Sequence, residues 1–332
     1  MGLRGYLTKR IIFGLFILYV IATLNFLIFQ VFSPIDPAST NLSPNMSEET
    51  MERMRVIYGL RDPLHIRYLK YIRNMFTWNF GWSFRSLRPV AEDMSWRLMN
   101  TVLLLGSVLI CTIAVGIPIG ILAASRRGTK TDLIAIGSGI FTFGVPTFFI
   151  QLLCLLFFSY YFKVYFGFPL FPPAGLHDVP PPEGAIPYMA NVAWHMAMPL
   201  LTLVVSGFGA WSLYTRNILL DSLTQDYIVT ARAKGLSERT VLYRHAFRSS
   251  LPPIVTIIAL AIPGIVTGAL ITESIFTWPG IGSWYISGLQ TGDYPVVQSI
   301  MFIYAVLMII ANIVADLLYA FLDPRIRVGM GR

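Results

Sequence analysis

The chain has 332 residues, of which 55% are hydrophobic and only 13% are charged, and its mean hydropathy is +0.64. Soluble domains carry about 25% charged residues, so this composition excludes an ordinary water-soluble globular protein. The net charge of +8 comes from basic residues beside apolar runs, a pattern that reflects membrane orientation and does not indicate nucleic-acid binding.

Six windows without a charged residue are long enough to cross a hydrocarbon core of ~30 Å as helices. A spanning segment must satisfy its own backbone hydrogen bonds, and these windows are too long for barrel strands. The sequence therefore predicts an all-α, multi-pass integral membrane protein of the cell membrane with six transmembrane helices. These are expected at residues 11–32, 98–125, 133–162, 196–215, 249–272 and 294–315.

The distribution of Lys and Arg predicts that both termini are cytoplasmic. Three basic residues lie in each tail, three in the second-to-third loop and six in the fourth-to-fifth loop, whereas the two short loops of the other side hold Lys163 alone. The first loop, residues 33–97, is longer than the ~60 residues beyond which charge no longer decides orientation.

That first loop is expected to form a large external domain. Met46–Tyr58 and Leu64–Trp78 have helical spacing, and Pro89 is expected to begin an amphipathic helix that enters the second span. Asn41 and Asn45 each begin a glycosylation sequon, but such tripeptides occur often by chance, so modification is not the expected state.

The loop between the third and fourth windows is rich in proline and predicts an irregular external cap, because proline interrupts helices and central strands. His177 in this loop and His195 beyond it lack the spacing of metal ligands. We therefore expect no metal site.

Three prolines lie inside predicted spans, namely Pro118, Pro146 and Pro263, each near a glycine. Proline breaks the backbone ladder and kinks a helix. Two interpretations stay open: tight helix packing, since Gly and Pro are frequent in membrane helices, or hinges beside a transport path.

No charged residue lies deep within a predicted span, and Glu273 and Asp316 lie near span ends. Transporters driven by protons or ions place ionisable groups near the midplane. This pattern argues against a stand-alone secondary transporter or channel, and it predicts that the free energy for any transport comes from elsewhere than these spans.

Residues 226–247, DYIVTARAKGLSERTVLYRHAF, form a polar stretch between the fourth and fifth spans. The segment before Gly235 has good helix formers, Gly235 fits a helix C-terminus, and Ser237 fits the N-cap of a second helix. The mixed charge favours docking of another protein over a lipid-surface helix, with apolar contacts expected from Leu236, Val241, Leu242 and Phe247.

This stretch resembles the EAA loop of binding-protein-dependent ABC importers, in its dipeptide and oligopeptide permease form. Ala231 and Gly235 match the general loop pattern, whereas Val229 and Thr230 stand where it has Glu and Ala. The resemblance extends in order over nearly the whole chain. It is also carried by YGLRDPLHIRYLKYI, NFGWSFRSLRPV, GIPIGILAA, ESIFTWPGIGSWYISGLQTGDYPVVQSI and ADLLYAFLDPRIR.

The resemblance implies a type I ABC importer permease fold, with a permease core at residues 98–322, a coupling loop at 216–248 and a cytoplasmic tail at 323–332. This chain would be the first of two different permease subunits that form a heterodimer. Its other partners would be two ATPase subunits, an external substrate-binding protein and membrane lipid. We expect no catalytic residue and no cofactor on this chain, with ATP and Mg²⁺ on the ATPase subunits, because the sequence has no G-x-x-x-x-G-K-[ST] phosphate loop.

The resemblance also implies two sets of site residues. Contact with the ATPase is expected from Asp226, Ala231, Arg232, Lys234, Gly235, Leu236, Ser237, Glu238 and Arg239. Gly235 is expected either to let two short helices approach closely or to take a positive φ. The outer gate and translocation path are expected to include Glu273, Trp278, Pro279, Gly280, Pro146 and Pro263. The implied substrates are dipeptides and oligopeptides, with oligosaccharides or nickel as alternatives.

Overall fold

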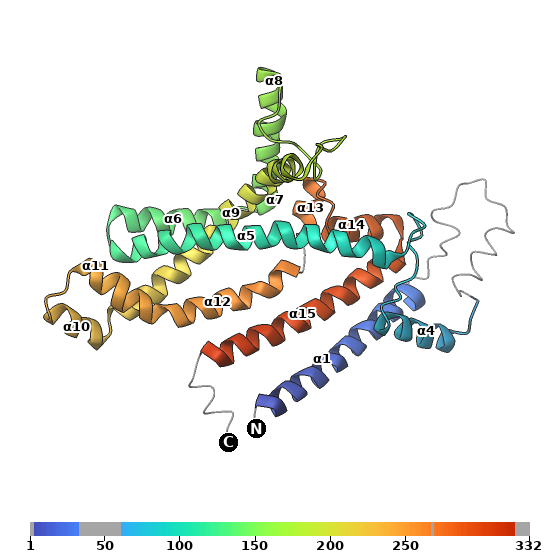
Figure 1. Cartoon of the computed structure of the whole chain (residues 1–332), viewed down its shortest axis with the longest axis horizontal. Coiled ribbons are helices and arrows are strands. Elements are labelled where there is room, and N and C mark those ends of the chain that lie inside the picture. Colours follow the sequence, from blue (N-terminus) through green and yellow to red (C-terminus); the bar gives the residue numbers. More distant parts are fainter. Residues whose placement is uncertain (1–2, 33–60, 267–268, 323–332) are drawn as a thin grey trace.

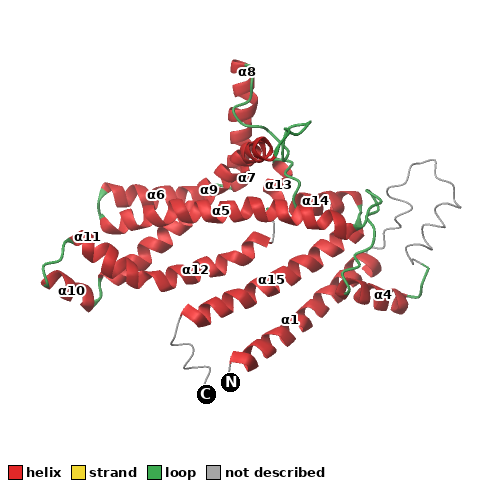
Figure 2. Cartoon of the chain, in the orientation of Figure 1, coloured by secondary structure: helices red, strands yellow, loops and turns green. Residues whose placement is uncertain are grey.

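A computed structural model describes residues 3–32, 61–266 and 269–322. Within these ranges the chain is helical apart from loops and one isolated bridge between Trp82 and Pro89 (Figure 2). Three short stretches of wider π-helix, η1 to η3, interrupt or extend α-helices. In chain order the elements are α1 (Leu3–Phe26), η1 (Leu27–Phe32), α4 (Leu64–Phe76), α5 (Val90–Ser125), α6 (Lys130–Gly144), α7 (Thr147–Cys154), η2 (Leu155–Tyr161), α8 (Phe162–Phe166), α9 (Ala185–Leu223), α10 (Asp226–Ala233), α11 (Glu238–Thr240), η3 (Val241–Phe247), α12 (Arg248–Val266), α13 (Leu270–Ile275), α14 (Ile281–Thr291) and α15 (Tyr294–Leu322).

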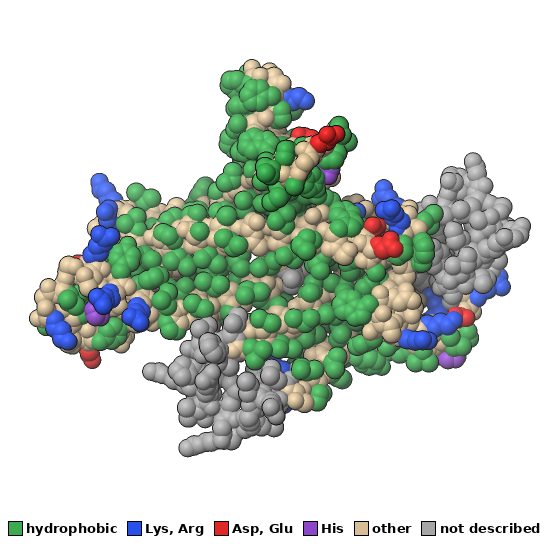
Figure 3. All heavy atoms as spheres, in the orientation of Figure 1, with side chains coloured by type: hydrophobic (Ala, Val, Ile, Leu, Met, Phe, Trp, Pro, Cys, Tyr) green, Lys and Arg blue, Asp and Glu red, His purple; other side chains and the backbone are tan. Residues whose placement is uncertain are grey.

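Six helical stretches are long and apolar enough to cross a membrane, which confirms the predicted number of spans. They are Thr8–Phe32, Val90–Ser125, Thr147–Phe166, Ala185–Leu223, Glu238–Ile265 and Tyr294–Ala315. Hydrophobic side chains cover the middle of the molecule, and charged side chains gather toward its two ends (Figure 3). The cytoplasmic location of both termini stays a prediction.

The prediction of one continuous third span at residues 133–162 is wrong. Helix α6 ends at Gly144, Val145 has extended dihedral angles (φ −84°, ψ 127°), and α7 begins after Pro146. Proline lacks a backbone N–H and disfavours helical geometry in the preceding residue, so Pro146 separates two helices. Figure 1 shows α6 running beside α5, while α7 to α8 leads away from the other helices.

The fifth predicted span, 249–272, also ends differently. Helix α12 contains Pro263 and ends at Val266, and Leu270–Ile275 forms the separate helix α13. By contrast, α5 begins directly after Pro89 and continues without interruption through Pro118, so the predicted entry helix of the second span is confirmed. The predicted helix at Met46–Tyr58, the two sequons and the tail from residue 323 lie outside the described residues.

Small residues allow α9 to pack closely against α5 and α6. A Cβ atom on Gly120 of α5 would lie 2.5 Å from the carbonyl oxygen of Ser212, and one on Gly209 of α9 would lie 2.6 Å from the Cα atom of Gly139 in α6. Real Cβ atoms do not approach so closely, so these glycines bring the backbones into direct contact. Such small-residue seams are typical of packed membrane helices.

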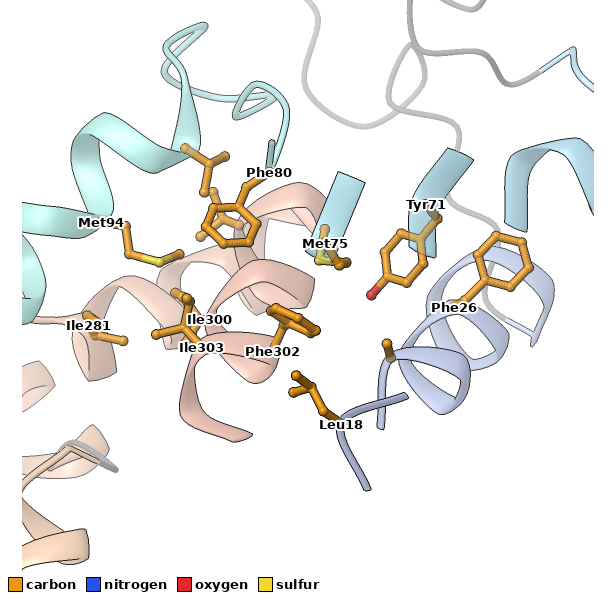
Figure 4. Packing of buried hydrophobic residues seen from close by; sticks show 13 residues of the cluster. Leu18, Phe26, Tyr71, Met75, Phe80, Met94, Ile281, Ile300, Phe302 and Ile303 are labelled. Carbon is orange, nitrogen blue, oxygen red and sulfur yellow. The ribbon is translucent and has the colours of Figure 1, made fainter. Parts of the chain in front are cut away.

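A hydrophobic cluster joins α1, α4, α5, α14 and α15 at the end opposite α10 and α11 (Figures 1 and 4). The ring of Phe26 in α1 lies 5.6 Å from that of Tyr71 in α4, and Phe76 at the end of α4 lies 5.6 Å from Phe302 in α15. Helix α4, predicted at Leu64–Trp78, is therefore held against two spans and ends two residues earlier than expected.

The proline-rich loop is irregular up to Gly184, as predicted, and attaches to the first turns of α9. The Asp178 carboxylate accepts a hydrogen bond from Asn191 Nδ2 (2.6 Å), and its other oxygen lies 3.5 Å from Nε2 of His195. His195 is buried, whereas Asp178 is exposed. No group of three or more metal-ligating side chains occurs in the part of the chain that the structure describes.

Candidate functional site

Helix α9 continues to Leu223, eight residues past the predicted end of the fourth span at residue 215, and then leads into α10 through an extended Gln225. From Asp226 to Phe247 the chain forms α10, a turn, α11 and η3, which we call the 226–247 unit. This arrangement of helix, glycine turn and helix is the one that the sequence predicts.

Gly235 makes the turn in a left-handed conformation with φ of +75°. Its N–H donates to the carbonyl oxygen of Arg232 (2.9 Å), and a Cβ atom placed on it would meet nothing within 4 Å. The positive φ is therefore what requires glycine here, and close approach of the two helices is not the reason.

Ser237 caps the second helix, as predicted. Its Oγ accepts a long hydrogen bond from the N–H of Thr240 (3.4 Å), which satisfies one of the free donors at a helix N-terminus. Across the turn, Nε and a terminal nitrogen of Arg232 donate to the two carboxylate oxygens of Glu238, at 2.9 and 3.1 Å. These two predicted contact residues therefore bind each other and fix the angle of the turn.

One face of the 226–247 unit packs inward. Ile228, Ala231, Val241 and Ala246 are buried against the ends of α5 and α9, where Leu219 is fully buried. Leu242 and Phe247 pack partly buried on the same cluster. Ala231 and Val241 therefore anchor the unit to the bundle and are not available to a partner, while Leu236 is exposed.

The other face is exposed, and it includes eight of the nine residues predicted to contact an ATPase. These are Asp226, Arg232, Lys234, Gly235, Leu236, Ser237, Glu238 and Arg239. Sequence reasoning missed three large side chains on this face: Tyr227 (43% exposed), Val229 (61%) and Tyr243 (52%). The local pattern does not mark these three residues, because their exposure depends on which sides of α10 and η3 pack against α5 and α9.

Two further contacts join α9 and α12, the helices on either side of the 226–247 unit, to each other and to α6. The hydroxyls of Ser222 in α9 and Ser250 in α12 lie 2.8 Å apart. One helical turn and a half before Ser222, Arg216 binds Asp132 of α6 with two hydrogen bonds of 2.6 and 2.8 Å. Asp132 was not recognised from the sequence, since its partner lies 84 residues away. The helix that leads into the unit, α9, is thus bonded both to α12, which leads out of it, and to α6.

The predicted outer gate is the second site, and its central feature is a buried carboxylate. Glu273 of α13 has no exposed surface, and its carboxylate accepts hydrogen bonds from the Thr101 hydroxyl (2.8 Å) and the Ser283 N–H (3.0 Å). Burial raises the pKa of the Glu273 carboxyl, while the bonds from Ser283, Thr101 and Gly282 oppose that rise.

Four hydrogen bonds connect α5 to α13, to the start of α14 and to the loop between them. Trp278 Nε1 donates to the carbonyl oxygen of Asn100 (3.0 Å), and Asn100 Nδ2 donates to that of Pro279 (3.1 Å). Thr101 accepts from the Ile281 N–H (2.9 Å) and donates to Glu273. We call this set of contacts the outer staple.

Position 280 of the outer staple has no room for a side chain. A Cβ atom there would overlap the Glu273 carboxylate and the Thr101 hydroxyl, so glycine is required. Pro146 is linked to this site only indirectly. It precedes α7, and Gln151 of α7 donates a hydrogen bond to the hydroxyl of Thr272, the residue before Glu273 (2.7 Å). Pro263 is buried within α12. The structure thus brings four of the six predicted gate residues together, namely Glu273, Trp278, Pro279 and Gly280.

A third buried carboxylate, Asp293, pins the outer segment before α5. It accepts hydrogen bonds from the Ser83 hydroxyl, the Phe84 N–H (3.0 Å) and the Arg85 N–H (3.3 Å), and it is only 3% exposed. Asp293 lies within the motif ESIFTWPGIGSWYISGLQTGDYPVVQSI, but the sequence alone predicted no role for it. The outer staple and Asp293 together lock the first residues of α5 to α14 and α15.

Comparison with known proteins identifies the family. Residues 116–328 match the model described as "Binding-protein-dependent transport system inner membrane component", and residues 3–104 match the model of the N-terminal part of this membrane component. The chain belongs to this family of transport-system inner membrane components. Membership and the six apolar helices establish a multi-pass cell membrane protein, which confirms the prediction.

Relatives of this inner membrane component match it over most of their length. The oligopeptide transport system permease protein AppB of Bacillus subtilis (strain 168) is 35% identical over 325 residues, which are 98% of this chain and 99% of that protein. The dipeptide transport system permease protein DppB of Escherichia coli (strain K12) is 34% identical over 300 residues, with 85% and 86% covered. The glutathione transport system permease protein GsiC of Salmonella paratyphi A is 30% identical, with 97% and 99% covered.

Among solved structures, a chain of the MetNI methionine ABC transporter in inward-facing conformations superposes with a TM-score of 0.50. It is 14% identical, and the match covers 69% of this chain and 96% of that one. At this identity the likeness concerns the fold alone, and it confirms the predicted ABC importer permease fold of this inner membrane component.

Proposed function

We propose that this chain is the membrane-spanning permease subunit of an ATP-driven importer of dipeptides and oligopeptides. It provides part of the translocation path, while separate ATPase subunits bind ATP and Mg²⁺ and hydrolyse the nucleotide. An external binding protein delivers the substrate, and a second, homologous permease completes the path. Oligosaccharides and nickel are the alternative cargoes for the same architecture.

The observation that carries this proposal is the two-sided construction of the 226–247 unit. Its inner face is packed into the bundle, and its outer face presents Val229, Tyr227 and Tyr243 among charged side chains. An apolar patch rimmed by charges is typical of a protein–protein interface. Because the unit packs against the ends of α5 and α9 and η3 continues directly into α12, a partner that moves the unit also moves these three helices, which supports a role in coupling.

The relatives support the cargo class. Proteins named as oligopeptide, dipeptide and glutathione permeases match this chain at 30–35% identity over most of their length. A transporter driven directly by protons is the rival mechanism, and buried Glu273 is the observation that would favour it. However, both oxygens of that carboxylate accept hydrogen bonds from fixed donors, which supports a structural role.

The test is co-expression of this chain with the ATPases and the second permease of its transport system. Val229→Asp places a charge in the apolar patch and is expected to lower ATPase co-purification and ATP-dependent uptake at least tenfold, while membrane insertion is unchanged. Thr129→Asp is the matched control, because Thr129 is exposed in the α5–α6 turn and Asp retains an N-cap. Uptake that does not depend on ATP and is abolished by a protonophore would overturn the proposal in favour of the proton-driven transporter.

A further inference from the structure

Arg97 lies on α5, one turn before Asn100 and Thr101 of the outer staple. The guanidinium carbon is 4.4 Å from the ring centroid of Trp96 and 5.0 Å from that of Trp284 in α14. Cations within about 6 Å of an aromatic ring are attracted to its face. Two indoles from different helices therefore hold this guanidinium in place.

The same guanidinium has donors that no group in the described part of the chain accepts. Arg97 forms no hydrogen bond or ion pair with any residue that the structure describes, and its buried Nε has no acceptor. Buried polar atoms in proteins are nearly always hydrogen-bonded, so each exception asks for an explanation. Arg232 and Arg216, by comparison, each bind a carboxylate through two nitrogens.

Among the residues that the structure describes, the carboxylates of Asp93 and Glu273 act on Arg97 electrostatically, and both are already engaged. The carboxylate of Glu273 is bound by Thr101 and Ser283, and the Asp93 carboxylate accepts a long bond from Trp96 Nε1 (3.5 Å). Neither forms an ion pair with Arg97. The hydroxyl of Tyr304, near the same Glu273 carboxylate, is also buried without a partner.

We propose that Arg97, held between Trp96 and Trp284, is a binding site for a carboxylate from outside this chain, supplied by the C-terminus of the transported peptide. This inference rests on the proposed function, because a peptide importer must move that carboxylate. A planar guanidinium binds a carboxylate through two parallel hydrogen bonds. The indole rings keep its plane fixed, so little ordering is lost when the anion arrives.

The location supports a role in transport. A free carboxylate is costly in the apolar part of a membrane protein unless it is paired. Arg97 lies beside the predicted outer gate, where a peptide entering from the outer side would first need such a partner. The adjoining indoles, of which Trp96 is 42% exposed, offer apolar surface to the side chains next to the terminus.

The test uses the complete transporter in proteoliposomes with its binding protein and one peptide in two forms, with a free C-terminal carboxylate and with an amide. We expect Arg97→Ala to lower uptake of the free-acid peptide about tenfold or more, since a charge-assisted bidentate contact is lost. Uptake of the amidated peptide should equal that of the wild type. Arg97→Lys keeps the positive charge but lacks the two parallel donors of a guanidinium, so it should restore part of the lost uptake of the free-acid peptide.

Comparing each variant with the wild type for the same peptide cancels the preference of the binding protein. Arg88→Ala is the matched control, since Arg88 is an exposed arginine of the outer segment, and it should change neither uptake. An equal loss for both peptides, with or without weaker docking of the binding protein, overturns the proposal, because Arg97 would then act structurally or bind a carboxylate of that protein. Unchanged uptake of both peptides also overturns it.

A second readout does not depend on transport. With 5-fluorotryptophan incorporated, and signals assigned by Trp96→Phe and Trp284→Phe, the free-acid peptide should shift both fluorine resonances of the detergent-purified complex. The shift should disappear in Arg97→Ala and with the amidated peptide. If the wild type imports neither peptide, the proposed function fails, and the fluorine shift still decides the carboxylate site: its absence overturns that site as well.

Discussion

Arg216 and Asp132 form a two-pronged ion pair that joins α9 to the first turn of α6, with side chains only 15% and 5% exposed. A third hydrogen bond, from the Gly128 N–H to the Asp132 carboxylate (2.9 Å), attaches the α5–α6 turn to this pair. Breaking one side of a buried pair leaves an uncompensated charge, which costs far more than the pair contributes.

Asp132→Ala is therefore expected to lower the free energy of unfolding by about 3–5 kcal/mol. The double variant Asp132→Leu with Arg216→Met removes both charges and should recover most of that loss, since apolar replacement of a buried pair is often neutral. Unfolding of the purified protein in mixed detergent micelles measures both. A wild-type stability for Asp132→Ala would contradict the role assigned to the pair.

The same pair predicts a pH dependence. The bonds from Arg216 lower the pKa of the Asp132 carboxyl to about 2, despite the opposing effect of burial. A depressed carboxyl pKa gives stability that is complete above the ordinary value near 4 and is lost as the pH falls through the folded value. The difference in unfolding free energy between wild type and Asp132→Ala should stay constant from pH 7 to about 4 and shrink toward pH 2.

Gly235→Val is expected to weaken ATPase co-purification and abolish uptake without preventing membrane insertion. A β-branched residue resists the φ of +75°, at a cost of about 1–2 kcal/mol, and the turn between α10 and α11 changes direction. Gly235→Asn should be tolerated better, because Asn accepts left-handed geometry. Gly137→Val in α6 is the matched control, as neither a positive φ nor a contact constrains Gly137. Wild-type uptake by Gly235→Val would refute the assignment.

Gly280→Ala should disrupt the outer staple, because the new methyl group overlaps Glu273 and Thr101. Forcing a methyl into a packed site costs about 1–3 kcal/mol, and we expect slower uptake with normal ATPase binding. Gly106→Ala in α5, where nothing lies within 4 Å of the added atom, serves for comparison. Equal uptake by Gly280→Ala and Gly106→Ala would mean that the outer staple does not affect substrate transport.

Asp293→Ala removes the acceptor of three donors in residues 83–85. Each buried donor left unsatisfied costs about 1–3 kcal/mol, so the outer loop should open more often. Limited trypsin digestion should then cut faster after Arg85. Asp62→Ala breaks only the exposed pair with Lys70 (2.6 Å), worth at most about 1 kcal/mol, and should leave the rate unchanged. Identical digestion of wild type and Asp293→Ala would contradict this account.

The spans were predictable because each needs many apolar residues in a row, and no tertiary contact is required to recognise them. The turn at Gly235 was predictable for a similar reason, since glycine and the Ser237 cap act locally. The break at Val145 and Pro146 was missed because the hydropathy of residues 133–162 does not change where the helix changes direction.

The candidate sites depended more on tertiary structure. Ala231 and Val241 point inward and Val229 outward, which follows only from where α10 meets α5 and α9. Asp132 and Arg216 are separated by 84 residues, and the pattern around either one does not reveal the other. Glu273, at the edge of a predicted span, was expected in the outer gate, but its burial could not be predicted because it depends on Thr101 and Ser283, which supply its hydrogen bonds.

Helix α9 has 39 residues, which at 1.5 Å per residue makes it about 58 Å long. One end is bonded to the proline-rich loop through His195 and Asn191, and the other leads directly into the 226–247 unit. A tilt of about 5° around its midpoint would displace each end by about 2.5 Å over that length. A single unbroken rod thus carries displacement from one membrane face to the other as a lever does, and no relay of side-chain rearrangements is needed in between.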